Sequence, residues 1–173
     1  MTKRAGSPSD RTDRPSDLSQ SPSSSCEICA VIPRLNDANP YFVRALGTGY
    51  VVLGWNQLYR GYTLFLGKRC VPELHLLTRD ERVVFLEEMA IVAEAVFRAF
   101  KPRKLNEELL GNGTPHLHWH LFPRHVDDPN PGFPVWSNPD FYKESNRRTE
   151  IDPVELASMR DRLRAEIDRL TTS

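Results

Sequence analysis

Three of the five histidines of the chain, His116, His118 and His120, stand at alternate positions with apolar residues between them. Alternation is the period of a β-strand, so a strand here would place the three imidazoles on one face and the apolar residues on the other. A helix would scatter the rings around its axis, and the glycine- and proline-containing stretch 111–115 disfavours a helix. So few histidines rarely give this spacing by chance, which indicates a chemical role.

The chemistry of the imidazole ring allows three explanations of this pattern. The rings could form the exposed polar face of a sheet whose other face is buried. They could all bind one metal ion, because alternate strand positions can supply ligands to the same ion. They could also be catalytic, with one imidazole as nucleophile and its neighbours as proton donors and phosphate ligands. The residue types alone leave these three explanations open.

The stretch from His116 to Phe122 has the pattern His-φ-His-φ-His-φ-φ, where φ is an apolar residue. This pattern resembles the signature of the histidine triad (HIT) family of nucleotide hydrolases and transferases. Pro123 and Arg124 follow it, as they do in many members. The similarity in order and spacing extends back to Cys26 and so covers more than half of the chain.

The resemblance implies a reaction at the α-phosphorus of a nucleotide. His118, the middle histidine, would attack the phosphorus and form a nucleotidyl-histidine that water then hydrolyses. The main-chain carbonyl of His116 would hold the proton on the other ring nitrogen of His118. His120 would bind a phosphate oxygen and assist the leaving group. His116 would then be structural, and Arg124 would form an ion pair or a dimer contact.

The leading cysteine pair and the Pro-Arg dipeptide are similar to those of bacterial members described as diadenosine polyphosphate hydrolases. The implied substrate is therefore a dinucleoside polyphosphate or a nucleoside phosphoramidate, with or without a divalent cation such as Mg²⁺. A nucleotidyltransferase and a non-catalytic nucleotide-binding or adaptor module are the alternatives. The resemblance also implies a homodimer.

Four residues are candidates for contacts with the nucleotide. Asn56 stands where HIT members carry a polar residue that contacts the ribose, although an asparagine that stabilises the turn is an equal alternative. The loop 111–115 contains Gly113, and glycine can expose main-chain N–H donors to an anion. Asn112 is the candidate for a phosphate contact and Asn106 is its alternative.

The three cysteines suggest a metal site. Cys26 and Cys29 form a CxxC pair, and Cys70 stands where zinc-binding relatives carry a histidine after two basic residues. Cysteine is itself a zinc ligand, so Cys26, Cys29, Cys70 and His116 could form a closed structural site. Replacement of Cys70 by His75 in that site, and loss of the site altogether, are the alternatives.

Length and charge restrict the class of protein. The 173 residues suffice for one domain with tails, and 23 basic residues balance 23 acidic ones. The sequence contains no basic block, which disfavours duplex nucleic acid as a partner. It also contains no apolar run of membrane-spanning length and no signal peptide. An odd number of cysteines favours reduced thiols or metal ligands. We expect a cytoplasmic protein with a small-molecule substrate.

Periodicity predicts the elements that carry these residues. Strands are expected over 41–46, 49–54, 62–66, 104–110 and 116–124. The sequence Thr78 to Glu81 matches a capping box, and apolar residues at spacings of three and four predict a helix over 79–100. Asp152 and Pro153 open a second amphipathic helix. The resemblance implies an α+β HIT fold, with an antiparallel sheet of about five strands, a long helix packed on it and a C-terminal helix.

Composition divides the chain into four parts. Residues 1–25 are rich in Ser, Pro, Asp and Arg and are predicted to be a disordered tail. Residues 26–126 are the predicted HIT domain. Residues 127–150 are predicted to be irregular, with aromatic residues that pack on the domain, cover the active site or complete a dimer. Residues 151–173 are the C-terminal helix, which packs on the domain or on a dimer partner.

Overall fold

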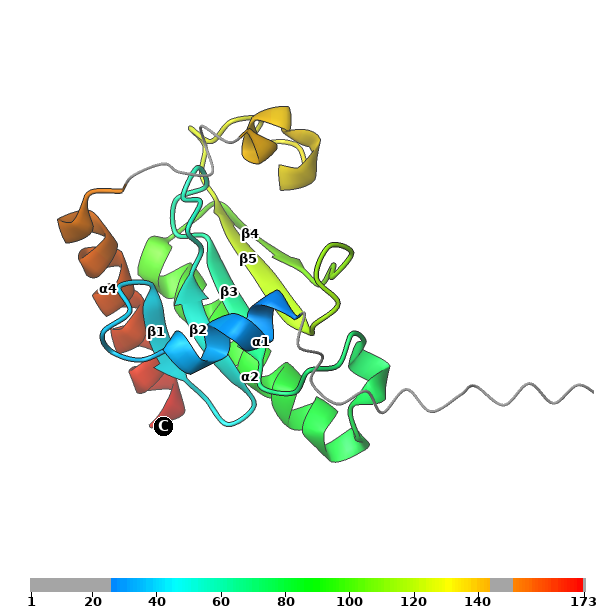
Figure 1. Ribbon diagram of the computed structural model, residues 1–173. Helices are drawn as coiled ribbons and strands as arrows, with labels where there is room; N and C mark the ends of the chain where they lie inside the picture. Colours follow the sequence, from blue (N-terminus) through cyan, green and yellow to red (C-terminus); the bar gives the residue numbers. More distant parts are fainter. Residues whose placement is uncertain (1–25, 144–150, 173) are drawn as a thin grey trace, which may run out of the picture.

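The computed structural model describes residues 26–143 and 151–172 (Figure 1). The predicted tail, residues 1–25, lies outside the described residues, as do residues 144–150 of the segment predicted to be irregular. None of the described helices is both long enough and apolar enough to cross a membrane.

The centre of the fold is an antiparallel sheet of five strands in the order β1-β2-β3-β5-β4, which confirms the α+β prediction. The strands are β1 (Phe42–Ala45), β2 (Gly49–Leu53), β3 (Thr63–Gly67), β4 (Lys104–Glu108) and β5 (His118–Arg124). The strand that carries the histidines lies between β3 and β4. It is therefore an interior strand, hydrogen-bonded on both sides.

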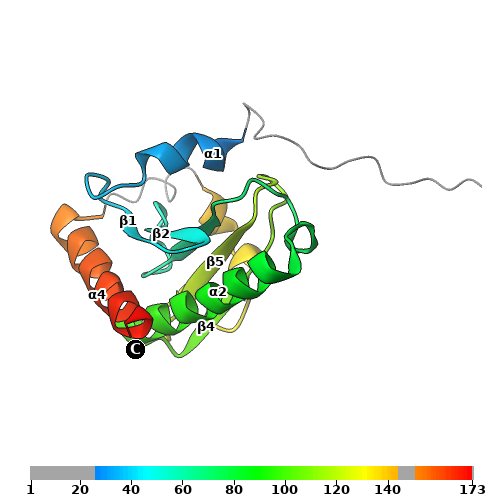
Figure 2. The same cartoon turned by 90° about the horizontal axis from the view of Figure 1, so that it is seen from below.

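Two helices cover one face of the sheet and a short helix lies across the other (Figure 2). Helices α2 (Arg79–Phe100) and α4 (Pro153–Thr171) pack on the first face, and α1 (Glu27–Val31) packs near the second. This layered arrangement follows from alternation in the strands, because each strand must bury apolar side chains on both faces.

Helix α2 forms over the range that the sequence predicts. The Thr78 side chain accepts a hydrogen bond from the N–H of Glu81, and the Glu81 carboxylate accepts one from the N–H of Thr78. This reciprocal capping box satisfies two N–H groups that a helix start leaves free. The helix ends where Lys101 adopts a left-handed conformation (φ 50°) before Pro102.

Helix α4 begins at the predicted cap, because the Asp152 carboxylate accepts a hydrogen bond from the N–H of Val154 at 2.8 Å. Its apolar stripe is buried against α2 and β1 in the main core. The stripe consists of Leu156, Met159, Leu163 and Ile167. Of the two positions left open by the sequence, the structure shows the helix packed on its own domain.

The strand with the histidines begins at His118, two residues later than the sequence predicts. Before it, the chain turns after Pro115, and the N–H of His116 bonds to the carbonyl of Thr114 at 2.8 Å. This local bond keeps His116 out of the strand ladder. The prediction that the strand includes His116 is therefore wrong.

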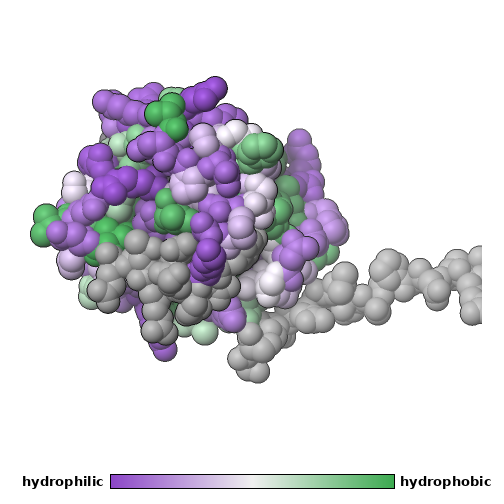
Figure 3. Space-filling view, turned by 90° about the horizontal axis from the view of Figure 1, so that it is seen from above, coloured by the Kyte–Doolittle hydropathy of each residue, from purple (hydrophilic) through white to green (hydrophobic). Residues whose placement is uncertain are grey.

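Residues 127–143 are less irregular than predicted. Two 3₁₀ helices form, Val135–Ser137 and Pro139–Tyr142. The second begins at a proline, which is tolerated in the first turn of a helix. Val135 and Phe141 are buried in a second apolar cluster with Tyr59, Tyr62 and Phe122. Trp136 and Phe141 of this segment thus pack on the domain, whereas Phe133 is 65% exposed. Viewed from above, the described surface is mainly hydrophilic with scattered apolar side chains (Figure 3).

Candidate active site

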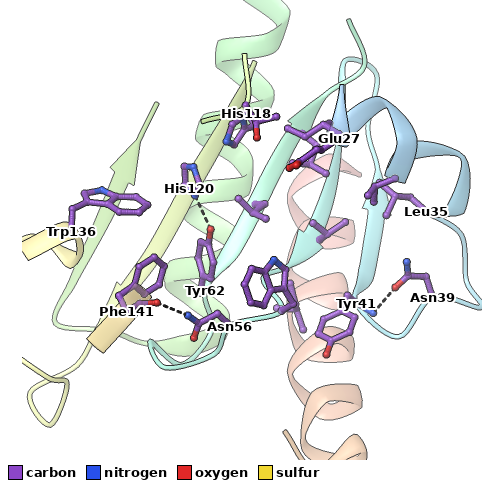
Figure 4. A pocket seen from close by; sticks show the side chains of 18 residues that line it. Glu27, Leu35, Asn39, Tyr41, Asn56, Tyr62, His118, His120, Trp136 and Phe141 are labelled. Atoms are coloured by element: carbon purple, nitrogen blue, oxygen red, sulfur yellow. Dashed lines mark hydrogen bonds between the residues drawn. The ribbon is translucent and has the colours of Figure 1, made fainter. Parts of the chain in front are cut away.

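His118 and His120 both line a pocket of about 450 Å³ on the face of the sheet opposite α2 (Figure 4). Their ring centroids are 4.7 Å apart, and the two rings are inclined at 65°. Leu117 and Leu121, which alternate with them, are buried in the main core on the other face. The strand period thus presents two imidazoles to one cavity, as the sequence predicts for this pair.

The ring of His118 is held by one main-chain hydrogen bond. Its Nδ1 lies 2.5 Å from the carbonyl oxygen of His116. A carbonyl oxygen only accepts hydrogen bonds, so Nδ1 must carry the proton and donate it. The other nitrogen, Nε2, therefore keeps its lone pair, which is the requirement for a nucleophilic imidazole.

The ring of His120 contacts a residue that sequence analysis did not identify. Its Nδ1 lies 2.7 Å from the hydroxyl of Tyr62. Burial, and after it the nearby His118, lowers the pKa of His120 to about 4, so the ring is neutral at pH 7. Burial, and after it the charge of Glu108, raises the pKa of Tyr62 above its usual value. The only sequence signal for Tyr62 is its place just before β3, and the pairing of β3 with β5 is not visible in the sequence.

Aromatic residues of the segment after β5 form one end of the pocket. Trp136 and Phe141 line it, and the Trp136 ring stands edge-on to His120 with centroids 5.4 Å apart. The indole N–H of Trp136 donates to the Glu108 carboxylate. Figure 4 shows Trp136 on the side of His120 that faces away from Glu27. Trp136 and Phe141 therefore do both things that the sequence left open: they pack on the domain, and they form part of the wall of the pocket.

The opposite end of the pocket is formed by residues at the start of the described part of the chain and by strand β2. Glu27 and Ile28 of α1 line this end. Trp55, which is 52% exposed, also lines the pocket. Sequence analysis did not predict α1, because a helix of five residues is too short to show a period.

The structure separates the four candidates for nucleotide contacts. Asn56 lines the pocket and is buried; its amide donates to the carbonyl of Phe141 at 3.2 Å, and its oxygen accepts the N–H of Leu58 at 3.1 Å. Asn56 therefore stabilises the turn through its own side chain, which was the alternative to a ribose contact. Asn106 does not line the pocket and accepts a hydrogen bond from Arg124 at 2.9 Å.

The loop before the triad reaches the pocket through a residue that was not predicted. Asn112 and Gly113 are exposed and do not line the cavity, whereas Thr114 does. Any nucleotide contact of Asn112 or Gly113 would therefore require the loop to move or the ligand to extend beyond the cavity.

All three cysteines and His116 gather beside the pocket. One candidate ligand atom from each of Cys26, Cys29, Cys70 and His116 lies within 4.8 Å of the others. The predicted variant with Cys70 is therefore the one that the structure brings together, and His75 is exposed and outside the group. The alternative in which all three histidines bind one ion is not what the structure shows, since His116 faces the sulfurs.

The geometry of this group fits a tetrahedral metal ion. The Nδ1 atom of His116 is 3.4 Å from the sulfur of Cys26 and 3.6 Å from that of Cys29. Tetrahedral zinc with ordinary Zn–S and Zn–N bonds separates these atoms by about 3.5 Å. The opposite nitrogen of His116, Nε2, lies 2.7 Å from the carbonyl oxygen of Gly67 and must donate to it. This bond leaves Nδ1 unprotonated and aimed at the sulfurs, as a metal ligand requires.

Comparison with known proteins agrees with this geometry. The family model described as HIT domain matches residues 49–127. Among curated proteins, none matches the chain. A histidine triad protein from Bradyrhizobium japonicum is 25% identical, with a TM-score of 0.63 over 73% of this chain and 89% of that chain.

Two more distant solved structures share the fold. One is a hypothetical histidine triad nucleotide-binding protein from Sulfolobus tokodaii, at 21% identity and a TM-score of 0.62 over 84% of this chain and 94% of that chain. The other is a Zn-bound histidine triad family protein from Mycobacterium smegmatis, at 19% identity and a TM-score of 0.60 over 86% of this chain and 96% of that chain. Because the family model matches residues 49–127 and the two histidines of β5 share one pocket, this part of the chain is a HIT domain.

Proposed function

We propose that the protein hydrolyses a nucleotide at its α-phosphorus, with His118 as the nucleophile. The observation that carries this proposal is the bond from Nδ1 of His118 to the carbonyl of His116, which leaves Nε2 with its lone pair inside the pocket. Imidazole that is neutral at pH 7 is a competent nucleophile, and its phosphoramidate is reactive enough to be hydrolysed.

The reaction has two steps. In the first, Nε2 of His118 forms a bond to the α-phosphorus, and the bond from phosphorus to the leaving group breaks with its electron pair going to the leaving group. In the second, a water oxygen bonds to phosphorus, the P–N bond returns its electron pair to Nε2, and the water proton passes to solvent. Throughout, Nδ1–H of His118 remains bonded to the His116 carbonyl, which stabilises the positive charge on the phosphorylated ring.

The substrate class that we propose is a dinucleoside polyphosphate or a nucleoside phosphoramidate. A pocket with aromatic residues at one end, Trp136 and Phe141, suits a nucleotide whose leaving group is itself large and aromatic. A nucleotidyltransferase and a non-catalytic nucleotide-binding module remain the alternative functions, and the products distinguish them.

We also propose that Cys26, Cys29, Cys70 and His116 hold a structural zinc ion. The separation of the ligand atoms and the hydrogen bond from Nε2 of His116 to Gly67 support this proposal. All four positions of a tetrahedral site would be filled by protein, so such an ion would have no open position for substrate. Its role would be to fix α1 and the turn that leads into β5.

The test is incubation of the purified protein with a diadenosine polyphosphate and, separately, with an adenosine phosphoramidate. We expect a nucleoside monophosphate as product, and acid quenching should trap a protein whose mass is increased by one nucleotidyl group. His118→Asn should reduce turnover by about a thousandfold or more, because no other imidazole occupies its position. His75→Asn is the control, since His75 is exposed and lies outside the pocket.

Two other outcomes would overturn hydrolysis, and a third would overturn the role of His118. Nucleotide binding without product from either substrate would establish a binding module. Product that appears only when a phosphate or sugar phosphate acceptor is added would establish a transferase. Turnover that survives in His118→Asn would remove His118 from the role of nucleophile.

A further inference from the structure

We propose that Tyr62 is a positioning residue that keeps the ring proton of His120 on Nε2, where it faces the pocket. His120 would then present an N–H donor to the substrate phosphate, while its neighbour His118 presents a lone pair. The hydrogen-bond arrangement does not depend on the proposed function, and only its catalytic consequence rests on that function.

The first support is the placement of the Tyr62 hydroxyl. It lies 2.7 Å from Nδ1 of His120, and the Tyr62 ring is 6% exposed. The ring stacks on Phe122 with centroids 4.2 Å apart and contacts the edge of Phe141. Packing on both of these rings leaves the tyrosine little freedom to turn its hydroxyl elsewhere.

The main chain of Tyr62 is fixed as well. Its N–H donates to the carbonyl of Tyr59 at 2.9 Å, and its carbonyl accepts the N–H of Gly54 and the side-chain amide of Gln57, both at 2.8 Å. Side chain and main chain together therefore hold the hydroxyl at one position, against one nitrogen of one histidine.

The second support is the direction of the hydrogen bond. Both partners are neutral at pH 7, since burial disfavours the tyrosinate and the imidazolium alike. Two arrangements are then possible: the phenol donates to Nδ1, or Nδ1–H donates to the phenol oxygen. In the second arrangement the phenol hydrogen would need another acceptor.

Within the described residues the Tyr62 hydroxyl has no other hydrogen-bond partner. The charge of the Glu108 carboxylate acts on Tyr62, but no hydrogen bond joins that carboxylate to the hydroxyl. A buried hydroxyl that leaves its hydrogen unpaired loses about 1–3 kcal/mol. The phenol therefore donates to Nδ1 of His120, and the histidine proton resides on Nε2.

The consequence is that two neighbouring imidazoles are held in opposite tautomers. His118 has its proton on Nδ1, because its partner there is a carbonyl, and His120 has its proton on Nε2, because its partner there is a phenol. The pocket thus offers one lone pair and one N–H donor 4.7 Å apart by ring centroid. This pair matches a phosphorus electrophile with a negatively charged oxygen attached to it.

The test reads the tautomer directly, by NMR of protein labelled with ¹⁵N in its histidines. With five histidines in the chain, the His120 signals can be assigned from a His120→Asn spectrum. At pH 7 we expect Nδ1 of His120 at the shift of an unprotonated nitrogen and Nε2 at that of a protonated one. In Tyr62→Phe we expect a mixture of both tautomers, because the aromatic packing is retained and only the donor is lost.

The matched control is Tyr59→Phe. Tyr59 belongs to the same aromatic cluster and is fully buried, but its hydroxyl bonds to Asn138 and Pro129 and not to the histidines. We expect Tyr59→Phe to leave the His120 tautomer unchanged, and Tyr62→Phe to lower turnover about tenfold or more relative to that control. Thermal melting checks that both variants fold.

A wild-type spectrum with the proton of His120 on Nδ1 would overturn the proposal, as would a tautomer that Tyr62→Phe leaves unchanged. Because the spectrum needs no substrate, it remains decisive even if the protein proves to have no hydrolase activity. If the tautomer is as expected but the two tyrosine variants have equal turnover, Tyr62 has no catalytic effect. That result would not decide whether the protein is a hydrolase, which the His118→Asn experiment tests separately.

Discussion

The main-chain carbonyl of His116 accepts the hydrogen bond that sets the tautomer of His118, while the imidazole of His116 faces the sulfurs of Cys26 and Cys29. One residue thus joins the cysteine cluster to the nucleophile. Cys26 has a second connection to the pocket, because it is the N-cap of α1, which lines the cavity with Glu27 and Ile28.

Removal of a metal ion from this cluster is therefore expected to weaken nucleotide binding. Without the ion, α1 loses its main anchor to the turn before β5, so the wall of the pocket is no longer fixed. We expect the chelated protein to bind an adenosine nucleotide about tenfold more weakly by calorimetry and to melt several degrees lower. Elemental analysis before and after chelation identifies the ion. Equal affinity and equal melting temperature in both forms would contradict this role.

The depressed pKa of His120 predicts a loss of stability in acid. The folded state holds the ring neutral down to a pKa of about 4, whereas the unfolded chain binds the proton near pH 6.5. The unfolded state therefore binds more protons between these values, so stability is full above pH 6.5 and falls as the pH drops towards 4. The pKa shift of His120 therefore lowers the free energy of unfolding by about 3 kcal/mol on acidification from neutral pH.

Urea unfolding of wild type and His120→Asn at pH 7 and pH 4.5 measures this contribution. The variant should lose less stability than wild type on acidification, and any contribution from the cysteine cluster cancels because both proteins contain it. A pH dependence that is identical in the two proteins would show that His120 is not the group responsible.

Arg124 is predicted to be essential for holding the segment after β5. It is 4% exposed, pairs with Asp128, and donates to Asn106 and to the carbonyls of Asn130 and Phe133. Replacement by methionine keeps the length of the side chain but leaves these buried acceptors unpaired. We expect Arg124→Met to reduce the free energy of unfolding by about 3–5 kcal/mol.

The control for Arg124→Met is Arg79→Met, because the Arg79 side chain is 84% exposed and its pair with Asp80 lies at the surface. Urea unfolding should show little change in that variant. Comparable destabilisation by the two substitutions would mean that the buried network of Arg124 contributes nothing beyond an ordinary surface charge.

Helix α4 is expected to be an integral part of the domain. Leu163 is fully buried in the main core, so Leu163→Ala should cost about 2–5 kcal/mol, in a single cooperative transition. Val154→Ala, at a position that is 77% exposed on the same helix, should be nearly neutral. An unfolding curve in which Leu163→Ala separates the loss of α4 from the loss of the sheet would contradict this expectation.

The sequence determined the local elements and the chemical identity of the site. The capping box at Thr78 and the apolar period behind it specify helix α2, since both depend only on residues within a few turns of one another. Strand alternation specifies that His118 and His120 share a face. The four candidate metal ligands could also be named, because the resemblance to zinc-binding HIT members implies their positions and cysteine at position 70 is itself a zinc ligand.

The tertiary structure decided what each of those residues contacts. Three contacts depend on how β3, β5, α1 and the later segment pack together: Tyr62 reaches His120, Trp136 stands at one end of the pocket, and the imidazole of His116 faces the sulfur of Cys26. These contacts join residues 16 to 90 positions apart in the chain. Periodicity records only near neighbours, so such long-range contacts leave no mark in the pattern of a single sequence.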